Sequence, residues 1–147
     1  MRFEELIPKL ESYCAYQERC LFEIQSKLNQ LAASETDSKK IIVHLLNNNF
    51  FDQFRYAQSF AYGKLRINKW GKAKIKLALT QKKIDADTIK NAIHSIDNEE
   101  YIEIIKSLIN RKKKDLSREE NDWIKKQKLI RYLVSKGFSY DEVEEFI

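Results

Sequence analysis

The chain has 147 residues, of which 43% are apolar and 33% are charged, and its 27 basic and 22 acidic residues give a net charge of +5. Three glycines and one proline provide little material for hairpin turns or for loops that cradle phosphate, which argues against an all-β fold and a glycine-rich nucleotide site. The length corresponds to one domain or to a short array of smaller units.

Apolar residues recur with helical spacing along the whole chain, as Tyr101, Ile105 and Leu108 illustrate. Pro8 lies inside the first such stretch, so that helix is expected to start late or to kink. The pattern predicts an all-α protein whose helices lie near residues 3–16, 18–30, 37–48, 52–66, 70–82, 86–95, 98–113, 118–135 and 140–147.

Several predicted helix ends carry recognisable signals. Gly137 suits the left-handed residue that often ends a helix. Three helix starts have a capping side chain three residues before a carboxylate, namely Asp97 with Glu100, Ser117 with Glu120 and Ser139 with Glu142.

The helices also repeat along the chain, because similar segments begin at Ile24, Ile75 and Leu129. Each unit is too small to bury a core alone, so we expect the units to stack into a single elongated domain. A long surface of this kind suits a macromolecular partner better than a small-molecule substrate. The expected parts are an N-terminal helix over 1–17, repeat 1 over 18–66, repeat 2 over 67–114 and an incomplete repeat 3 over 115–147.

No residue pattern indicates catalysis or metal binding. His44 lies between Val43 and Leu45, and His94 follows Ile93, so both are expected to be partly buried helix residues. Cys14 and Cys20 would lie about 240° apart on one helix, which forbids a disulfide between them. We therefore expect reduced, buried cysteines, no enzyme activity, no cofactor and no metal.

Two further features of the sequence indicate the cellular compartment. No run of 18 apolar residues is present, and the N-terminal segment carries acids, so neither a membrane span nor a signal peptide is predicted. We expect a cytoplasmic, monomeric protein.

The most informative feature is the distribution of charge. Between Asp52 and Asp85 the sequence has nine basic residues and no acidic one, whereas the rest of the chain has a net charge of −4. A solvated helix face usually mixes both signs, so this interval predicts a surface that binds a phosphate backbone or an acidic protein groove. The residues assigned to this surface are Arg55, Lys64, Arg66, Lys69, Trp70, Lys72, Lys74, Lys76 and Lys83.

Two details of this interval refine the predicted surface. On a helix slightly longer than 70–82, Lys69, Lys72, Lys76 and Lys83 would form one basic stripe. Trp70 and Tyr62 lie among the cations and could stack on bases or pack at a helix junction.

A second basic run, from Arg111 to Arg131, is mixed with acids and is interpreted as a solvated surface.

The segment Asp52-Gln-Phe-Arg55-Tyr56-Ala57-Gln-Ser-Phe60 resembles the D-x-x-R-[FY]-A-x-x-F signature of the RecX family. A basic segment follows, as in that family, and then the family element that begins at Gly71. Lys136-Gly137-Phe138 resembles the same family element in the third repeat. The resemblance covers about residues 10 to 147, and the residues near Cys14 and Cys20 look like the version from Bacteroidetes-type bacteria. Lys83 stands where the family often has glycine, so the turn there must be built differently or place Lys83 at positive φ.

This resemblance implies tandem three-helix repeats and a non-enzymatic regulator of the RecA recombinase, with roles in DNA repair, recombination and the SOS response. Such proteins bind in the groove of the RecA–DNA filament and restrain ATP hydrolysis, strand exchange and co-protease activity. The basic surface would then meet DNA or an acidic surface of RecA. The resemblance does not distinguish a protein that caps the filament from one that coats its groove. Two alternative functions are a free-standing nucleic-acid-binding protein and an interaction scaffold with no DNA role.

Overall fold

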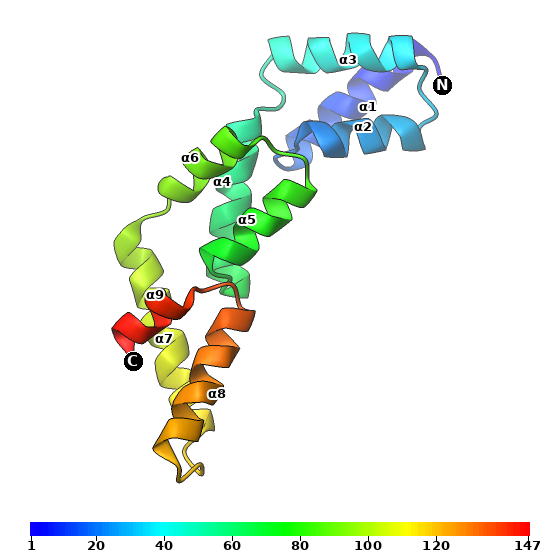
Figure 1. The fold of residues 1–147 in the computed structure, drawn as a ribbon. Coiled ribbons are helices and arrows are strands. Elements are labelled where there is room, and N and C mark those ends of the chain that lie inside the picture. Colours follow the sequence, from blue (N-terminus) through cyan, green and yellow to red (C-terminus); the bar gives the residue numbers. More distant parts are fainter. The chain divides into compact units, whose positions relative to one another are not determined.

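The predicted helical periodicity is realised along the whole chain. The computed structural model describes residues 1–147 and contains no strand, which confirms the all-α prediction. In Figure 1 the helices follow one another as α1 Phe3–Tyr16, α2 Leu21–Gln30, α3 Glu35–Asn47, α4 Gln53–Gly63, α5 Lys72–Gln81, α6 Ala86–His94, α7 Asn98–Asp115, α8 Asp122–Ser135 and α9 Tyr140–Phe146, with a π-helical turn, η1 Lys64–Asn68, continuing α4.

Capping groups explain where the helix starts differ from the prediction. The Ser117–Glu120 signal is not used, because the Asn121 side chain accepts a hydrogen bond from the Ile124 N–H and α8 begins after it. The caps at Asp97 and Ser139 are confirmed. A late start of α1 was the wrong expectation, since that helix begins at Phe3 and includes Pro8.

The helices form two compact units. Residues 1–59 and 79–92 make up the first, and residues 60–78 and 93–147 make up the second. The boundary between them runs through α4, α5 and α6, so each of these three helices belongs partly to either unit.

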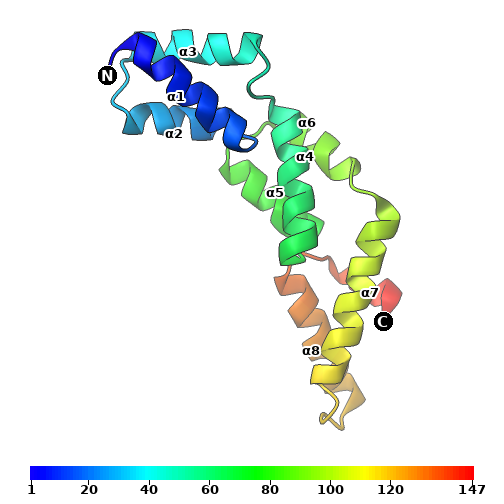
Figure 2. The same ribbon diagram turned by 180° about the vertical axis from the view of Figure 1, so that it is seen from behind.

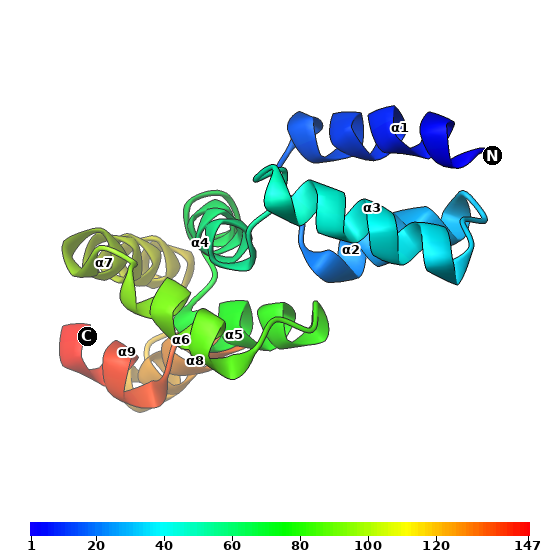
Figure 3. The same cartoon turned by 90° about the horizontal axis from the view of Figure 1, so that it is seen from above.

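In the first unit, α1, α2 and α3 pack against one another (Figure 3). Each of these helices buries residues spaced four apart, which is the spacing of one helical face. The result is an aliphatic core made of Leu6, Leu10, Cys14, Ile24, Leu28, Ile41, Leu45 and Phe51.

In the second unit, α7, α8 and α9 pack against one another, and Figure 2 shows α7 and α8 side by side. The buried Tyr101 ring of α7 contacts the Phe138 ring, with centroids 5.5 Å apart. The Tyr101 hydroxyl also accepts a hydrogen bond from the Lys72 N–H at 3.0 Å, which attaches the start of α5 to α7.

A close backbone approach joins α5 to the end of α8. The Gly71 N–H donates to the Lys136 carbonyl at 2.8 Å, and the Ala73 N–H donates to the Gly137 carbonyl at 3.0 Å. A Cβ atom on Gly71 would overlap the carbonyl carbon and oxygen of Gly137. Gly137 itself has φ +102°, which confirms the predicted left-handed end of α8.

The helices α2, α5 and α8 end with the same turn. In each, the residue after a left-handed position donates its N–H to the carbonyl five residues earlier, which satisfies an otherwise unpaired helix carbonyl. Lys83 has φ 59°, so the alternative that this lysine adopts positive φ is confirmed. In these three turns the left-handed residues are Ala32, Lys83 and Gly137, and the bonds run from Ala33 to Leu28, from Ile84 to Leu79 and from Phe138 to Leu133. The helix α3 ends in the same way, with Asn49 left-handed and a bond from Phe50 to Leu45.

Replacing Gly71 with alanine should lower the free energy of unfolding by about 3 kcal/mol, because the new methyl group meets backbone atoms that cannot rotate away. Urea denaturation followed by circular dichroism measures the change. Gly63→Ala is the matched control, since Gly63 is helical and its added Cβ meets nothing within 4 Å. That variant should gain about 1 kcal/mol, and similar losses in both variants would contradict the close approach.

A second substitution tests the left-handed helix ends. Ala32→Gly should raise the free energy of unfolding by about 1 kcal/mol, because glycine adopts φ 56° without the steric cost that alanine bears there. Ala78→Gly, in the middle of α5, should lower it by about as much. Equal destabilisation by the two substitutions in the same denaturation assay would show that Ala32 is not strained.

Candidate nucleic-acid interface

The predicted binding residues are divided between the two units. Arg55 and Lys83 belong to the first unit, whereas Lys64, Arg66, Lys69, Trp70, Lys72, Lys74 and Lys76 belong to the second. The expected stripe of four lysines on one helix is wrong. Lys69 and Lys83 lie outside α5 and have left-handed backbone conformations, with φ of 57° and 59°. Only Lys72 and Lys76 lie on that helix, one turn apart.

Arg55 is already paired with an acid in the first unit. Its Nε donates to both Glu18 carboxylate oxygens at 2.8 Å, and this bonding raises the pKa of the guanidinium. The Arg55 N–H donates to Asp52 Oδ1 at 2.8 Å and so caps the start of α4. Tyr56 and Ala57 are buried. These motif residues therefore hold α4 in place within the first unit.

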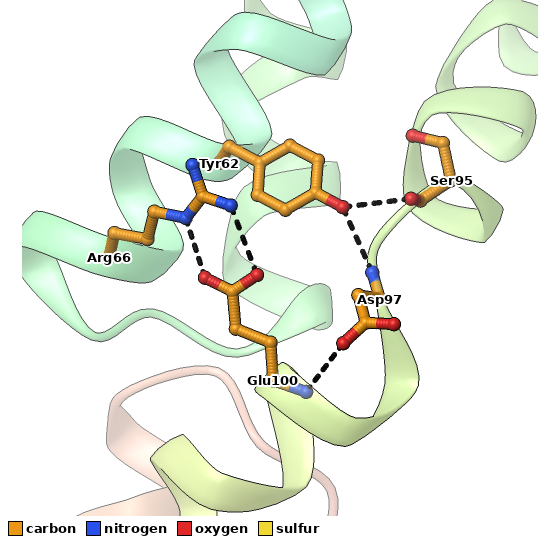
Figure 4. Close-up of polar contacts among 5 residues, drawn as sticks. All are labelled: Tyr62, Arg66, Ser95, Asp97 and Glu100. Atoms are coloured by element: carbon orange, nitrogen blue, oxygen red, sulfur yellow. Dashed lines mark hydrogen bonds and ion pairs between the residues drawn. The ribbon is translucent and has the colours of Figure 1, made fainter.

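Arg66 is also paired, in the second unit, as Figure 4 shows. Its guanidinium bonds both carboxylate oxygens of Glu100, the NH2 group at 3.0 Å, and lies 4.3 Å from the centroid of the Tyr62 ring. The Tyr62 hydroxyl donates to the Ser95 carbonyl at 2.9 Å and accepts from the Asp97 N–H at 3.0 Å. Tyr62 and Arg66 thus connect α4 and η1 to the start of α7.

Trp70 gathers two of the predicted lysines. The Lys64 Nζ lies 4.9 Å from the Trp70 ring centroid and the Lys74 Nζ lies 4.7 Å from it, both within the range of cation–π attraction. The chain brings them together because Lys69 adopts the left-handed conformation, and the Trp70 N–H then donates to the Lys64 carbonyl. The half-buried Trp70 ring therefore positions two ammonium groups.

Lys136 adds a third ammonium group to this site. Its Nζ donates to the Asn68 carbonyl at 2.7 Å, and burial together with the charge of Lys74 lowers the pKa of Lys136. The Gly71–Gly137 approach explains this proximity, because it places Lys136 and Lys74 on either side of one backbone crossing. We call Lys64, Trp70, Lys74 and Lys136 the Trp70 cluster.

The Trp70 cluster has an uncompensated positive charge. Lys64, Lys74 and Lys136 take part in none of the salt bridges of the chain. Holding like charges together without a carboxylate is unfavourable unless an anion binds. Nearby, Lys72 lies over the Tyr101 ring, and Lys69 is close enough to Glu100 to help lower the pKa of that carboxyl, after Arg66.

Sequence reasoning assigned Lys136 no binding role. Lys136-Gly137-Phe138 had been noted only as a family element, and Lys136 lies far along the chain from Lys64 and Lys74. Pairing Gly71 with Gly137 was the signal that would have found it, because two glycines next to basic residues indicate a close backbone approach.

The other titratable groups singled out in the sequence lie apart from this cluster. Cys14 and Cys20 are free and buried, and burial raises the pKa of Cys14 to about 11. His44 has no acidic residue near it in sequence, but in the structure its Nε2 lies 2.9 Å from a carboxylate oxygen of Glu11 on α1. No group of His, Cys, Asp or Glu side chains could hold a metal ion, and no helix is long and apolar enough to cross a membrane.

Fold and helix order define a class: all-α proteins built from tandem three-helix domains. The chain belongs to the RecX family. The family's second three-helix domain matches residues 52–93 and its third three-helix domain matches residues 99–147, which together make up more than half of the chain. These ranges group α4–α6 and α7–α9, one helix out of phase with the repeats 18–66, 67–114 and 115–147, and those repeat boundaries stay a prediction.

Relatives and solved structures agree with this assignment. The chain is 36% identical over 128 residues to the regulatory protein RecX of Clostridium acetobutylicum, covering 85% of this chain and 59% of that protein. It is 31% identical to the regulatory protein RecX of Lactobacillus johnsonii, covering 88% and 48%. The chain thus spans about half the length of these relatives. The crystal structure of RecX from Lactobacillus salivarius superposes with a TM-score of 0.89 at 25% identity, covering 98% of this chain and 93% of that one.

The Arg66–Glu100 pair predicts a pH-dependent contribution to stability. The hydrogen bond from Arg66 holds the pKa of Glu100 below its ordinary value of 4.5. Glu100 should therefore stabilise the fold above that value, and the contribution should be lost as pH falls through the lowered pKa. Glu100→Gln should reduce the melting temperature at neutral pH and have no effect in strong acid.

The matched control for this experiment is Glu99→Gln, which removes an exposed carboxylate of the same helix turn. Thermal melts of both variants across the acidic range measure the effect. If the two variants show the same pH dependence, the pairing with Arg66 is not its source.

Proposed function

We propose that this protein is a non-enzymatic regulator of the RecA recombinase that binds the RecA–DNA filament. By binding there it restrains ATP hydrolysis, strand exchange and co-protease activity, and so modulates DNA repair and recombination. Membership of the RecX family supports the proposal, and the relatives are regulatory proteins by name. The protein acts as a monomer and needs no small-molecule substrate.

One observation carries the nucleic-acid part of the proposal. The Trp70 cluster holds three ammonium groups with no carboxylate partner, and phosphodiester oxygens are the anions that such a set would take up. Trp70 positions Lys64 and Lys74 through cation–π contacts. Lys69, Lys72 and Lys76 flank the cluster in the same unit and extend the basic surface.

The two arginines have a different role in this proposal. The guanidinium groups of Arg55 and Arg66 form salt bridges with Glu18 and Glu100, so each arginine stabilises its own unit rather than contacting DNA. Lys83 has a structural role at the end of α5, where its left-handed backbone closes the helix.

A second candidate function is free-standing nucleic-acid binding without RecA, which the three ammonium groups of the Trp70 cluster also favour. Such binding would weaken steeply with salt, because each phosphate contact releases counterions. A protein that acts through RecA would instead inhibit the filament under conditions where its binding to bare DNA is already weak. A scaffold with no DNA role would lose nothing when the lysines are replaced.

The deciding experiment measures RecA ATP hydrolysis and strand exchange on single-stranded DNA with sub-stoichiometric amounts of the protein. The parent should inhibit both reactions. The double substitution Lys64→Gln and Lys74→Gln should raise the half-inhibitory concentration roughly 25-fold at about 0.1 M salt, since two single-strand phosphate contacts are lost.

The control removes the same charge elsewhere. Lys9 and Lys90 are exposed in the first unit, so Lys9→Gln with Lys90→Gln should inhibit like the parent. If the parent protein leaves RecA activity unchanged, the regulatory function is wrong. If the Lys64/Lys74 variant and the triple variant Lys69→Glu, Lys72→Glu, Lys76→Glu both inhibit like the parent, the surface is wrong although the function stands.

A further inference from the structure

A second basic site lies between α7 and α8 in the second unit. There the two helices, which pack against each other (Figure 2), leave a hollow of about 390 Å³. From the end of α7 come Lys112 and Leu116, and from α8 come Lys128, Arg131, Tyr132 and Ser135. In the sequence most of these residues belong to the basic run from Arg111 to Arg131, whose mixture with acids favours an ordinary solvated surface.

The side chains around the hollow make specific contacts with one another, which a solvated surface of mixed charge does not require. The Lys112 Nζ lies 4.6 Å from the centroid of the Tyr132 ring, so an aromatic surface of α8 holds a cation of α7. Lys128 is bonded to Glu119 at 3.2 Å, which is the one carboxylate that pairs with a lining residue. Lys112 and Arg131 have no such partner and leave the hollow positively charged.

The helix dipole explains only part of this charge. Cations in the last turn of α7, including Lys112, compensate the partial negative charge at a helix C-terminus. Lys128 and Arg131, however, lie in the middle of α8, where no such compensation operates. A neighbouring hollow on α7 includes Glu103 and no aromatic ring, so the one between α7 and α8 is better suited to an anion with a planar group.

One residue of the Trp70 cluster, Lys136, directly follows α8, the helix that supplies most of the residues lining the hollow. Lys128 and Lys136 are eight residues apart at the two sites, which corresponds to about 12 Å along the axis of α8. Cations along a groove combined with aromatic rings are typical of surfaces that bind single-stranded nucleic acid. A strand of a few nucleotides is long enough to reach both sites.

We propose that the hollow between α7 and α8 binds the phosphodiester backbone of the same single strand that contacts the Trp70 cluster, with Lys112 and Arg131 on phosphates and Tyr132 as an apolar platform. This inference rests on the nucleic-acid part of the proposed function. It extends the interface to a part of the chain that the acid-free interval does not include.

The test measures binding of fluorescein-labelled oligo(dT) by fluorescence anisotropy between 50 and 200 mM salt, a range over which phosphate contacts change affinity strongly. The substitutions Lys112→Gln and Arg131→Gln should together make the slope of log affinity against log salt less steep by about 1.4, since each single-strand contact contributes about 0.7. Lys9→Gln with Lys90→Gln is the control of equal charge and should retain the parental slope.

The outcomes separate this inference from the proposed function. If the slope falls for Lys64→Gln with Lys74→Gln but stays parental for the Lys112/Arg131 variant, the hollow does not bind the strand and the Trp70 cluster stands. If neither variant changes the slope, the nucleic-acid part of the proposed function is wrong as well. A loss of RecA inhibition with an unchanged slope would assign the hollow to a protein partner and overturn the proposal.

Two further measurements complete the test. Millimolar dTMP that binds the parent but not the Lys112/Arg131 variant, and that leaves oligo(dT) binding to the parent unchanged, would identify a mononucleotide site and overturn the strand assignment. Lys112→Arg with Arg131→Lys keeps both charges and should restore the parental slope. Failure of this restored variant, when its circular dichroism melt matches the parent, would show that the site is not an electrostatic phosphate contact.

Discussion

The second unit depends on the backbone contact between Gly71 and Gly137. At this point the start of α5 and the end of α8 approach so closely that neither residue has room for a side chain, and two backbone hydrogen bonds close the contact. The contact brings Lys74 close to Gly137, the residue after Lys136, and the Lys72 N–H donates to the Tyr101 hydroxyl at the same end of α5. Because backbone atoms make the contact, it does not depend on the rotamer of any side chain.

Assembling the Trp70 cluster is unfavourable on its own. Lys136 loses hydration and is repelled by Lys74, as the lowered pKa of its ammonium shows. The fold compensates with the Asn68 carbonyl, which accepts a hydrogen bond from Lys136, and with the Trp70 ring, which attracts Lys64 and Lys74. Neither compensating group has a net charge, so the site retains its attraction for anions. A carboxylate in the same place would have stabilised the fold and abolished that attraction.

Local patterns predicted the helices well, whereas long-range contacts escaped them. Apolar spacing and capping residues act within one or two turns, so every α-helix of the structure was predicted from the sequence, whereas the π-helical turn η1 was not. The start of α8 was missed because Asn121 competes with Ser117 for the same role. The acid-free interval also misled, because Glu18 and Glu100 come from outside it and pair with Arg55 and Arg66. A segment without acids in the sequence is therefore not a surface without acids in space.

The residues that identify the family and those proposed to bind are largely different sets. Asp52 and Arg55 hold α4 in place, Tyr56 and Ala57 are buried, and Gly71 makes room for the α5–α8 contact. Such residues specify how three-helix domains are built. The proposed contacts instead come from lysines whose positions follow from that construction. Similarity in the motif therefore identifies the framework, whereas the strength and the salt dependence of binding depend on which cations the framework brings together without an acid.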